Sequence, residues 1–303
     1  MTIATTEPST HRSRYRSRRD PHPVVVDRAE PVVWGGVDDG PLDADELRRF
    51  DERGLLRYGA LFSAEEITEL HHEARRLAGD ATVAGSELAV REPGDDEVRS
   101  VFAVHQLSDV FAELAADERL AGRARQVLGS DVYLHQTRVN LKPGFRGREF
   151  YWHSDFETWH LEDGMPGMRC LSVSLGLTEN TELNGGLMVM PGSHKTFVGC
   201  VGETPDDHYK ESLREQRVGT PDDQTLTWLA AQHGIELATG DAGAATFFDC
   251  NAMHGSNGNI TPYPRSNVFL VYSSVHNTLV EPFGGTAPRP DFIAHRTFEP
   301  LPR

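Results

Sequence analysis

Apolar residues follow a helical spacing in the first half of the chain. Ala44–Asp51 is charged and helix-prone. Ser63 and Glu66 have the spacing of a capping box, ahead of apolar positions on one helix face at Ile67, Leu70, Ala74 and Leu77. Ser108–Leu128 predicts a third helix. The sequence therefore predicts that the helices come first.

After Gly129 the pattern changes to alternating and β-branched segments separated by glycine and proline. These segments predict strands at Val132–Lys142, Met168–Thr178, Leu187–Met190, Ala244–Phe248 and Asn267–Val275. Helices followed by short strands of antiparallel type indicate the α+β class. We expect a mainly β core, built as a sandwich or jelly roll, with helices packed on one face.

The first forty residues differ from this pattern. Residues 1–20 carry several arginines among serine and threonine, namely Arg12, Arg14, Arg16, Arg18 and Arg19. Such a composition buries too little surface to offset the entropy of an ordered chain. We therefore expect residues 1–40 to form a disordered or extended tail with a solvated basic cluster, and residues 41–303 to form a single domain.

One predicted strand carries polar and apolar residues on the same face. Strict alternation along Val132–Lys142 groups Val132 and Leu134 with Gln136, Arg138 and Asn140. A face of this kind is either exposed to solvent or lines a polar cavity.

Composition narrows the possible partners. The 303 residues include 30 Lys and Arg against 46 Asp and Glu, so the net charge is −16. This charge disfavours nucleic acid and anionic membrane surfaces, and no stretch approaches the roughly 20 apolar residues of a transmembrane helix. The 3 cysteines form no CxxC pair, which suits a reducing compartment. We expect a cytoplasmic protein without nucleic-acid or membrane partners.

Three His-x-acid triplets are candidates for metal binding. His71-His72-Glu73 falls within a predicted helix, where residues two apart point about 200° apart and cannot hold one ion. His160-Leu161-Glu162 is expected in a polar loop. His153-Ser154-Asp155 follows the apolar run Phe150-Tyr151-Trp152 at the expected end of a strand. Because residues two apart on a strand point the same way, His153 and Asp155 can reach one ion.

His254 is the candidate third ligand, since it follows the apolar run Ala244–Phe248 and a tight turn. Two imidazoles and one carboxylate form the facial triad of non-haem Fe(II), and similar ligands occur in catalytic zinc sites. Arg265 favours iron, because its guanidinium can hold the distal carboxylate of 2-oxoglutarate by two parallel hydrogen bonds. Taken alone, Arg265 is also typical of a surface arginine after a turn.

The run Phe150–His160, with the sequence FYWHSDFETWH, resembles the signature of the ectoine hydroxylases. The similarity extends roughly from Leu42 to the C-terminus and includes Glu162–Pro166, Asn184–Met188, Pro191–His194, His254–Ser256 and Arg265–Asn267. These enzymes belong to the phytanoyl-CoA-hydroxylase-like branch of the non-haem Fe(II), 2-oxoglutarate-dependent dioxygenases. The resemblance implies a double-stranded β-helix, or jelly roll, flanked by helices.

The resemblance also implies roles for individual residues. Fe(II) would be bound by His153, Asp155 and His254. The co-substrate 2-oxoglutarate would be held by Arg265, Ser256, Phe150 and Asn267, with O₂ as the second co-substrate. The substrate site would be shaped by Gln136, Asn140, Trp159, Ser172, Phe248 and Phe269.

The implied reaction is hydroxylation of ectoine to 5-hydroxyectoine with release of succinate and CO₂, a step of compatible-solute biosynthesis. Ectoine is a small zwitterion, and Trp159 offers a ring face to its cationic amidinium, while Gln136 or Asn140 can hydrogen-bond polar ring atoms. The family also implies a homodimer. Three other functions stay open: a 2-oxoglutarate oxygenase for another small polar solute, a zinc-dependent hydrolase on the same fold, and a jelly-roll ligand-binding module without turnover.

Overall fold

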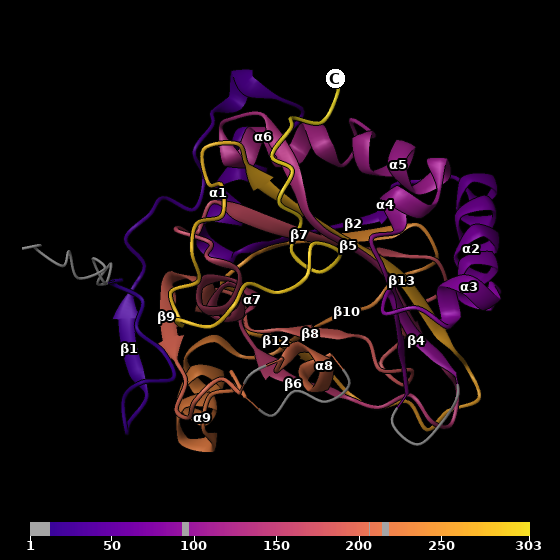
Figure 1. Ribbon diagram of the computed structural model, residues 1–303. Coiled ribbons are helices and arrows are strands. Elements are labelled where there is room, and N and C mark those ends of the chain that lie inside the picture. Colours follow the sequence, from indigo (N-terminus) through magenta and orange to yellow (C-terminus); the bar gives the residue numbers. More distant parts are fainter. Residues whose placement is uncertain (1–12, 93–96, 206, 214–217) are drawn as a thin grey trace, which may run out of the picture.

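Two antiparallel sheets form the centre of the molecule (Figure 1). The computed structural model describes residues 13–92, 97–205, 207–213 and 218–303. The larger sheet has the order β2 (Leu55–Ala60), β11 (Ala244–Asp249), β7 (Cys170–Gly176), β13 (Arg265–Ser274), β5 (Val132–Lys142), β4 (Val98–Phe102) and β3 (Ala89–Arg91). The smaller sheet has the order β10 (Glu236–Ala238), β8 (Leu187–Val189), β12 (His254–Ser256) and β6 (Phe150–His153). Apart from both, β1 (Val24–Asp27) pairs with β9 (Thr196–Gly199).

Helices cover the outer face of the larger sheet (Figure 1). They are α1 (Ala44–Arg53), α2 (Ala64–Gly79), α3 (Ala81–Ala84), α4 (Val104–Leu107), α5 (Asp109–Ala116) and α6 (Ala121–Leu128). The remaining helical segments are η1 (Val37–Asp39), α7 (Asp155–Thr158), the π-helix η2 (Trp159–Asp163), η3 (Ser193–Lys195), α8 (Tyr209–Ser212) and α9 (Asp223–His233). No helix in the described residues is long and apolar enough to cross a membrane. The predicted jelly-roll core flanked by helices is confirmed.

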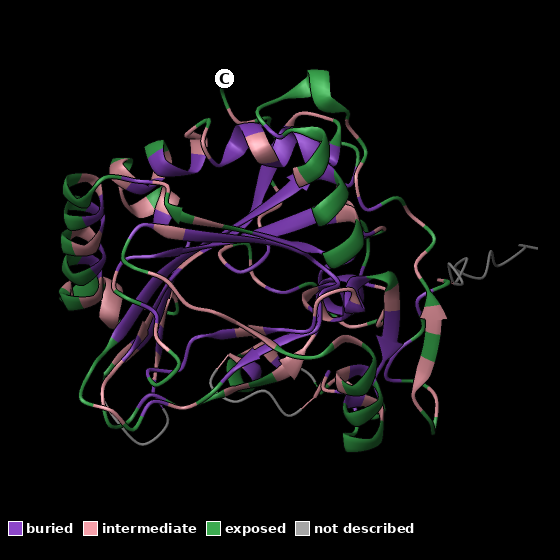
Figure 2. Cartoon of the chain, turned by 180° about the vertical axis from the view of Figure 1, so that it is seen from behind, coloured by how far each residue is buried: buried purple, intermediate pink, exposed green. Residues whose placement is uncertain are grey.

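Side-chain alternation along the strands separates two apolar layers. Val268 and Leu270 of β13 pack in the cluster beneath the helices, together with Phe247 of β11. The alternate residues Phe248 and Phe269 turn the other way and pack with residues of β8 between the sheets. Burial is accordingly concentrated in the strands, while the outward faces of the helices are exposed (Figure 2). The interior between the sheets is therefore where a buried site can form.

Helix α2 begins as the sequence predicts. The Glu66 backbone N–H donates to Ser63 Oγ at 3.3 Å, and the Ser63 N–H donates to the Glu66 carboxylate at 2.7 Å. The predicted single helix Ser108–Leu128 is wrong, because α5 ends at Ala116 and α6 begins at Ala121. Asp117 leaves the helical region at ψ 128°, and its carboxylate accepts the Arg119 N–H at 2.8 Å. A short acidic side chain that bonds nearby backbone in this way favours a turn over a continued helix.

A β-bulge in β5 changes which side chains face the interior. Val271 pairs with Gln136 and the next residue, Tyr272, pairs with Leu134, so His135 is the extra residue. Val132 and Leu134 consequently lie in the cluster beneath the helices, as does Val139 beyond the bulge. The predicted single face is therefore wrong: the bulge separates Val132 and Leu134 from Gln136, Arg138 and Asn140.

The described part of the expected N-terminal tail packs against the domain. Tyr15 and Arg18 are only 3% and 4% exposed, and β1 forms a ladder with β9. Arg18 is paired with Glu157 and Glu162, so the expectation of a solvated basic cluster is wrong for this residue. Residues 1–12 of the expected tail lie outside the described residues.

Candidate metal centre and its surroundings

Two neighbouring strands and the helix after one of them bring the three predicted ligands together. His153 on β6 and His254 on β12 are register partners, and their ring centroids lie 4.3 Å apart. Asp155 opens α7 directly after β6. Its Oδ1 lies 3.7 Å from His153 Nε2, and its Oδ2 lies 3.9 Å from His254 Nε2. The ligand atoms all lie within 4.8 Å of one another, a group that can hold one metal ion.

Backbone carbonyls orient both imidazoles. His153 Nδ1 lies 2.7 Å from the Tyr151 carbonyl, and His254 Nδ1 lies 3.0 Å from the Ala252 carbonyl. A carbonyl can only accept, so each Nδ1 carries the proton and each Nε2 lone pair is turned towards Asp155. Burial and the neighbouring His254 lower the pKa of His153 to about 4. His153 is therefore neutral at pH 7 and available to a metal ion.

Residues of the larger sheet surround the carboxylate. Ser172 Oγ on β7 donates to Asp155 Oδ2 at 3.3 Å. The Phe248 ring lies 5.0 Å from the His254 ring, and Phe248 packs in the same cluster as Phe269. The structure thus places these three predicted substrate residues around the metal ligands, with Ser172 bonded to a ligand itself.

A group of basic side chains lies at one end of β5 and β13. Arg265 and Lys142 are register partners, and both are buried. In the described residues, Arg265 Nε has no hydrogen-bond partner, and burial lowers the pKa of Arg265 to about 10. Lys142 Nζ donates to Ser256 Oγ at 2.9 Å and to the Asn257 carbonyl. Burial, reinforced by Arg265, lowers the pKa of Lys142 to about 6.

This basic group contains two residues that sequence reasoning missed. Lys142 lies in register with Arg265, and Arg138 lies over the Phe269 ring with its charged carbon 5.0 Å from the ring centroid. Arg138 Nε also has no partner in the described part of the chain. The available signal was the spacing of Arg138, Asn140 and Lys142 on alternate strand positions, which places all three on one face. Several buried basic side chains so close together favour an anionic ligand.

The remaining predicted co-substrate residues lie near the basic group. Phe150 is the register partner of Ser256 and lies 5.9 Å from Lys142 Nζ. Asn267 donates to Ser174 Oγ at 2.9 Å, whereas its Oδ1 has no partner among the described residues. The four residues predicted to hold 2-oxoglutarate therefore occupy adjoining strands of the two sheets.

The other predicted substrate residues, Gln136, Asn140 and Trp159, contact residues other than the metal ligands. Gln136 donates to the Ile293 carbonyl at 2.7 Å, and Asn140 accepts from Ser100 Oγ at 2.7 Å. The Trp159 ring lies 4.9 Å from the His135 ring. The expected loop around His160 is in fact the buried π-helix η2, in which Trp159 is the first residue.

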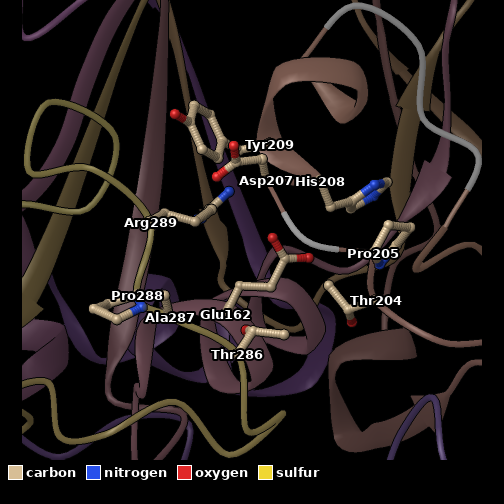
Figure 3. Close-up of a pocket in the computed structure, with 10 residues that line it drawn as sticks. All are labelled: Glu162, Thr204, Pro205, Asp207, His208, Tyr209, Thr286, Ala287, Pro288 and Arg289. Carbon is tan, nitrogen blue, oxygen red and sulfur yellow. The ribbon is translucent and has the colours of Figure 1, made fainter.

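A cavity of about 240 Å³ lies between η2, the start of α8 and residues 286–289 (Figure 3). Glu162 and Arg289 extend into it from different segments (Figure 3). Arg289 forms two hydrogen bonds to Asp163, at 2.7 and 2.6 Å, and Asp163 lies 3.3 Å from His135 Nε2. Glu162 and Glu157 both form ion pairs with Arg18, and Glu162 also interacts electrostatically with Arg289 of the same cavity.

The donor set fits Fe(II) and a dicarboxylate co-substrate. Two imidazoles and a carboxylate leave open positions on a six-coordinate ion. The buried cations beside this group supply the positive charge that a 2-oxoglutarate carboxylate requires. A protein with these parts can bind a metal, hold a dianion next to it and keep both away from bulk water.

Comparisons with known proteins show which family this chain belongs to. The profile of the phytanoyl-CoA dioxygenase (PhyH) family matches residues 50–267. The ectoine dioxygenase of Streptomyces coelicolor is 56% identical over 279 residues, which cover 92% of this chain and 93% of that protein. The ectoine dioxygenase of Stutzerimonas stutzeri is 53% identical over 289 residues, covering 95% and 96%.

Solved structures of EctD also match this chain. EctD from S. alaskensis in its apoform has a TM-score of 0.86 and 47% identity, covering 95% of this chain and 97% of that one. The crystal structure of EctD with 2-oxoglutarate and 5-hydroxyectoine also has a TM-score of 0.86, at 46% identity and with 95% and 96% covered. Because the family profile spans most of the chain and the relatives are more than half identical, the chain belongs to the phytanoyl-CoA dioxygenase (PhyH) family.

Proposed function

We propose that this protein is an Fe(II)- and 2-oxoglutarate-dependent dioxygenase that hydroxylates ectoine to 5-hydroxyectoine. The observation that carries the proposal is the His153, Asp155 and His254 group next to the buried basic residues Arg265 and Lys142, of which Lys142 bonds Ser256 on the strand of His254. A hydrolase needs the metal ligands but has no need for a dianion pocket beside them. The 56% identity to an ectoine dioxygenase supports ectoine as the substrate.

The reaction balances without a further reductant. One oxygen atom of O₂ enters the C–H bond of ectoine to give C–OH, and the other enters the carboxylate of succinate as 2-oxoglutarate loses CO₂. Iron with its co-substrates supplies the oxidising power when bound. The protein residues bind, orient and desolvate the reactants.

The residues of the site divide this work. His153, Asp155 and His254 bind the ion through atoms that the backbone and Ser172 already orient. Arg265, with Lys142, Ser256, Phe150 and Asn267, holds 2-oxoglutarate, and Arg138 adds positive charge. Phe248 and Phe269 form an apolar wall that excludes water next to the ligands.

The substrate needs contacts for both of its charges. Trp159 offers a ring face to the amidinium. In the wall of the 240 Å³ cavity, the Glu162 carboxylate is suited to the same cation and the Arg289 guanidinium to the carboxylate. Gln136, Asn140 and Ser172, which lie outside the lining of that cavity, are the remaining polar residues of the proposed substrate site. The protein acts as a cytoplasmic homodimer in this proposal, with residues 41–303 as its single catalytic domain.

The test is a coupled assay on the purified full chain. With Fe(II), 2-oxoglutarate, O₂ and ectoine, mass spectrometry should detect 5-hydroxyectoine and succinate in equal amounts. His254→Ala is the matched inactive control. Succinate formed with another small solute but not with ectoine would overturn the substrate and keep the reaction class. Zinc-dependent hydrolysis without succinate would overturn the class.

A further inference from the structure

The N-terminal segment outside the PhyH match contacts both chain segments that carry metal ligands. The family match begins at residue 50, whereas the contacts described here come from residues 13–30. This segment passes along β9 next to α7 (Figure 1). Its two buried arginines, Arg18 and Arg28, bind different ligand-bearing segments.

Arg18 binds the helix that starts with Asp155. Its side chain is 2% exposed, and its guanidinium donates from Nε and Nη2 to the two oxygens of Glu157, at 3.0 and 2.6 Å. Nη1 donates to Glu162 at 2.5 Å, on the far side of Trp159. Arg18 therefore joins α7, which begins with Asp155, to η2, which begins with Trp159.

Neighbouring residues fix Arg18 in this position. Ser17 Oγ donates to Glu157 and accepts the Cys200 N–H at 2.7 Å. Tyr15 packs edge-on against Phe156, with ring centroids 5.3 Å apart. Arg18 itself has a φ of 53°, an unfavourable backbone conformation for a non-glycine residue that its ion pairs must offset. A strained residue held by several partners is typical of a position with a specific role.

Arg28 binds the turn that leads to His254. Its Nη1 donates to Asp249 Oδ2 at 2.7 Å, and Nη2 donates to the Met168 carbonyl. Asp249 Oδ1 in turn accepts the Asn251 N–H at 2.8 Å. Asn251 Oδ1 accepts from Ser154 Oγ at 2.9 Å, which links this turn to the residue between His153 and Asp155.

We propose that residues 13–30 form a strap that positions the metal centre, with Arg18 and Arg28 as positioning residues. Arg18 fixes the segment of Asp155 and Trp159, and Arg28 fixes the turn before His254. Neither arginine touches the reactants. The strap therefore sets the positions of the short strand and the four-residue helix that carry His153 and Asp155. The inference rests on the proposed metal site and reaction.

Different consequences follow for the two arginines. Arg18→Met loosens Asp155 and Trp159 together, so it should weaken metal binding and also raise the fraction of succinate formed without 5-hydroxyectoine. Arg28→Met loosens the turn before His254 and has no direct contact with the segment of Trp159, so it should weaken metal binding with a smaller effect on coupling. Residues that orient metal ligands typically contribute about 10–100-fold to affinity.

The experiment compares these variants with Arg16→Met. Arg16 lies in the same segment, but its side chain is 61% exposed and paired only with Asp20. Co(II) affinity is measured by calorimetry without co-substrate, alongside the ratio of 5-hydroxyectoine to succinate and the melting temperature. We expect at least a tenfold loss of Co(II) affinity in Arg18→Met and Arg28→Met, and none in Arg16→Met.

Each other outcome has a defined meaning. A lower melting temperature with unchanged Co(II) affinity and unchanged coupling would show that the strap only stabilises the fold, and would overturn the inference. If Arg18→Met does not fold, Arg18→Lys replaces it, because lysine keeps the charge but cannot form the forked contact. Wild-type behaviour of Arg18→Lys in both assays would then overturn the inference. A wild-type chain without metal binding or ectoine turnover would refute the proposed function itself.

Discussion

Lys142 on β5 and Arg265 on β13 occupy directly opposed positions of an antiparallel ladder, so two buried basic side chains share one end of the sheet. Like charges at opposed positions repel each other. Burial, reinforced by Arg265, lowers the pKa of Lys142 to about 6, so Lys142 is neutral at pH 7. A bound dianion would reverse this effect and restore the charge of Lys142.

Binding of 2-oxoglutarate should therefore take up protons. The neutral lysine of the free protein gains a proton when the dianion raises its pKa, so affinity should fall as the pH rises above about 6, by up to about tenfold per unit. Calorimetry at pH 7.5 in two buffers of different ionisation enthalpy measures the uptake. Lys142→Met is the control and should abolish it. Equal binding enthalpies in both buffers would contradict the prediction.

Arg265→Lys should not be a conservative change. An ammonium group cannot form the two parallel hydrogen bonds of a guanidinium, and charged hydrogen bonds contribute about 1.5–3 kcal/mol. We expect the KM for 2-oxoglutarate to rise roughly tenfold or more, with little change in the KM for ectoine. Steady-state kinetics with each substrate varied in turn checks this. Equal damage to both KM values would indicate that Arg265 acts through folding.

Replacement of His153, Asp155 or His254 by alanine should abolish Fe(II) binding and turnover. The ligand atoms face one another, and we expect the fold to persist because ligands of an open metal site are usually not part of the core packing. Metal content by mass spectrometry and circular dichroism on the same samples test both parts. His72→Ala serves as a control on the surface of α2 and should retain iron. Full activity of His254→Ala would refute the assignment of this ligand.

Trp159→Ala should weaken ectoine use more than it weakens substrate-free 2-oxoglutarate decay. Loss of a cation–π contact costs about 0.5–2 kcal/mol, and loss of a buried tryptophan also lowers stability by about 3–5 kcal/mol. Assays are therefore run well below the melting temperature. Trp159→Phe keeps a ring face and should lie between the wild type and alanine. A parallel decline of both reactions would place Trp159 outside the substrate site.

The metal ligands were predictable because their signal is local. The strand periodicity of an apolar run predicted that His153 and Asp155 lie together, and they do, although the strand ends at His153 and Asp155 is the first residue of α7. The capping box of Ser63 and Glu66 is local in the same way. The sequence predicted correctly that Gln136, Arg138 and Asn140 share a face, but it wrongly added Val132 and Leu134. The bulge at His135 arises from the pairing of β5 with β13, so the alternation within β5 alone does not predict it.

The roles of Lys142 and Arg18 were not predicted, because their partners are distant in the sequence. Lys142 ends a strand, where a lysine is usually solvated, and its burial comes from Ser256 and Arg265. Arg18 lies in a segment whose composition is typical of disorder. Its carboxylate partners lie at positions 157 and 162, so no window of the sequence contains the pair.

The contacts of the strap can form only late in the synthesis of the protein. Arg18 lies 139 residues before Glu157, and Arg28 lies 221 residues before Asp249. At about 5–20 residues per second, the first translated segment waits roughly ten seconds or more for the partner of Arg28 to be made. Closure of such long loops is entropically costly and yields contacts late. The segment that positions the metal centre is therefore translated first, and its contacts are among the last to form.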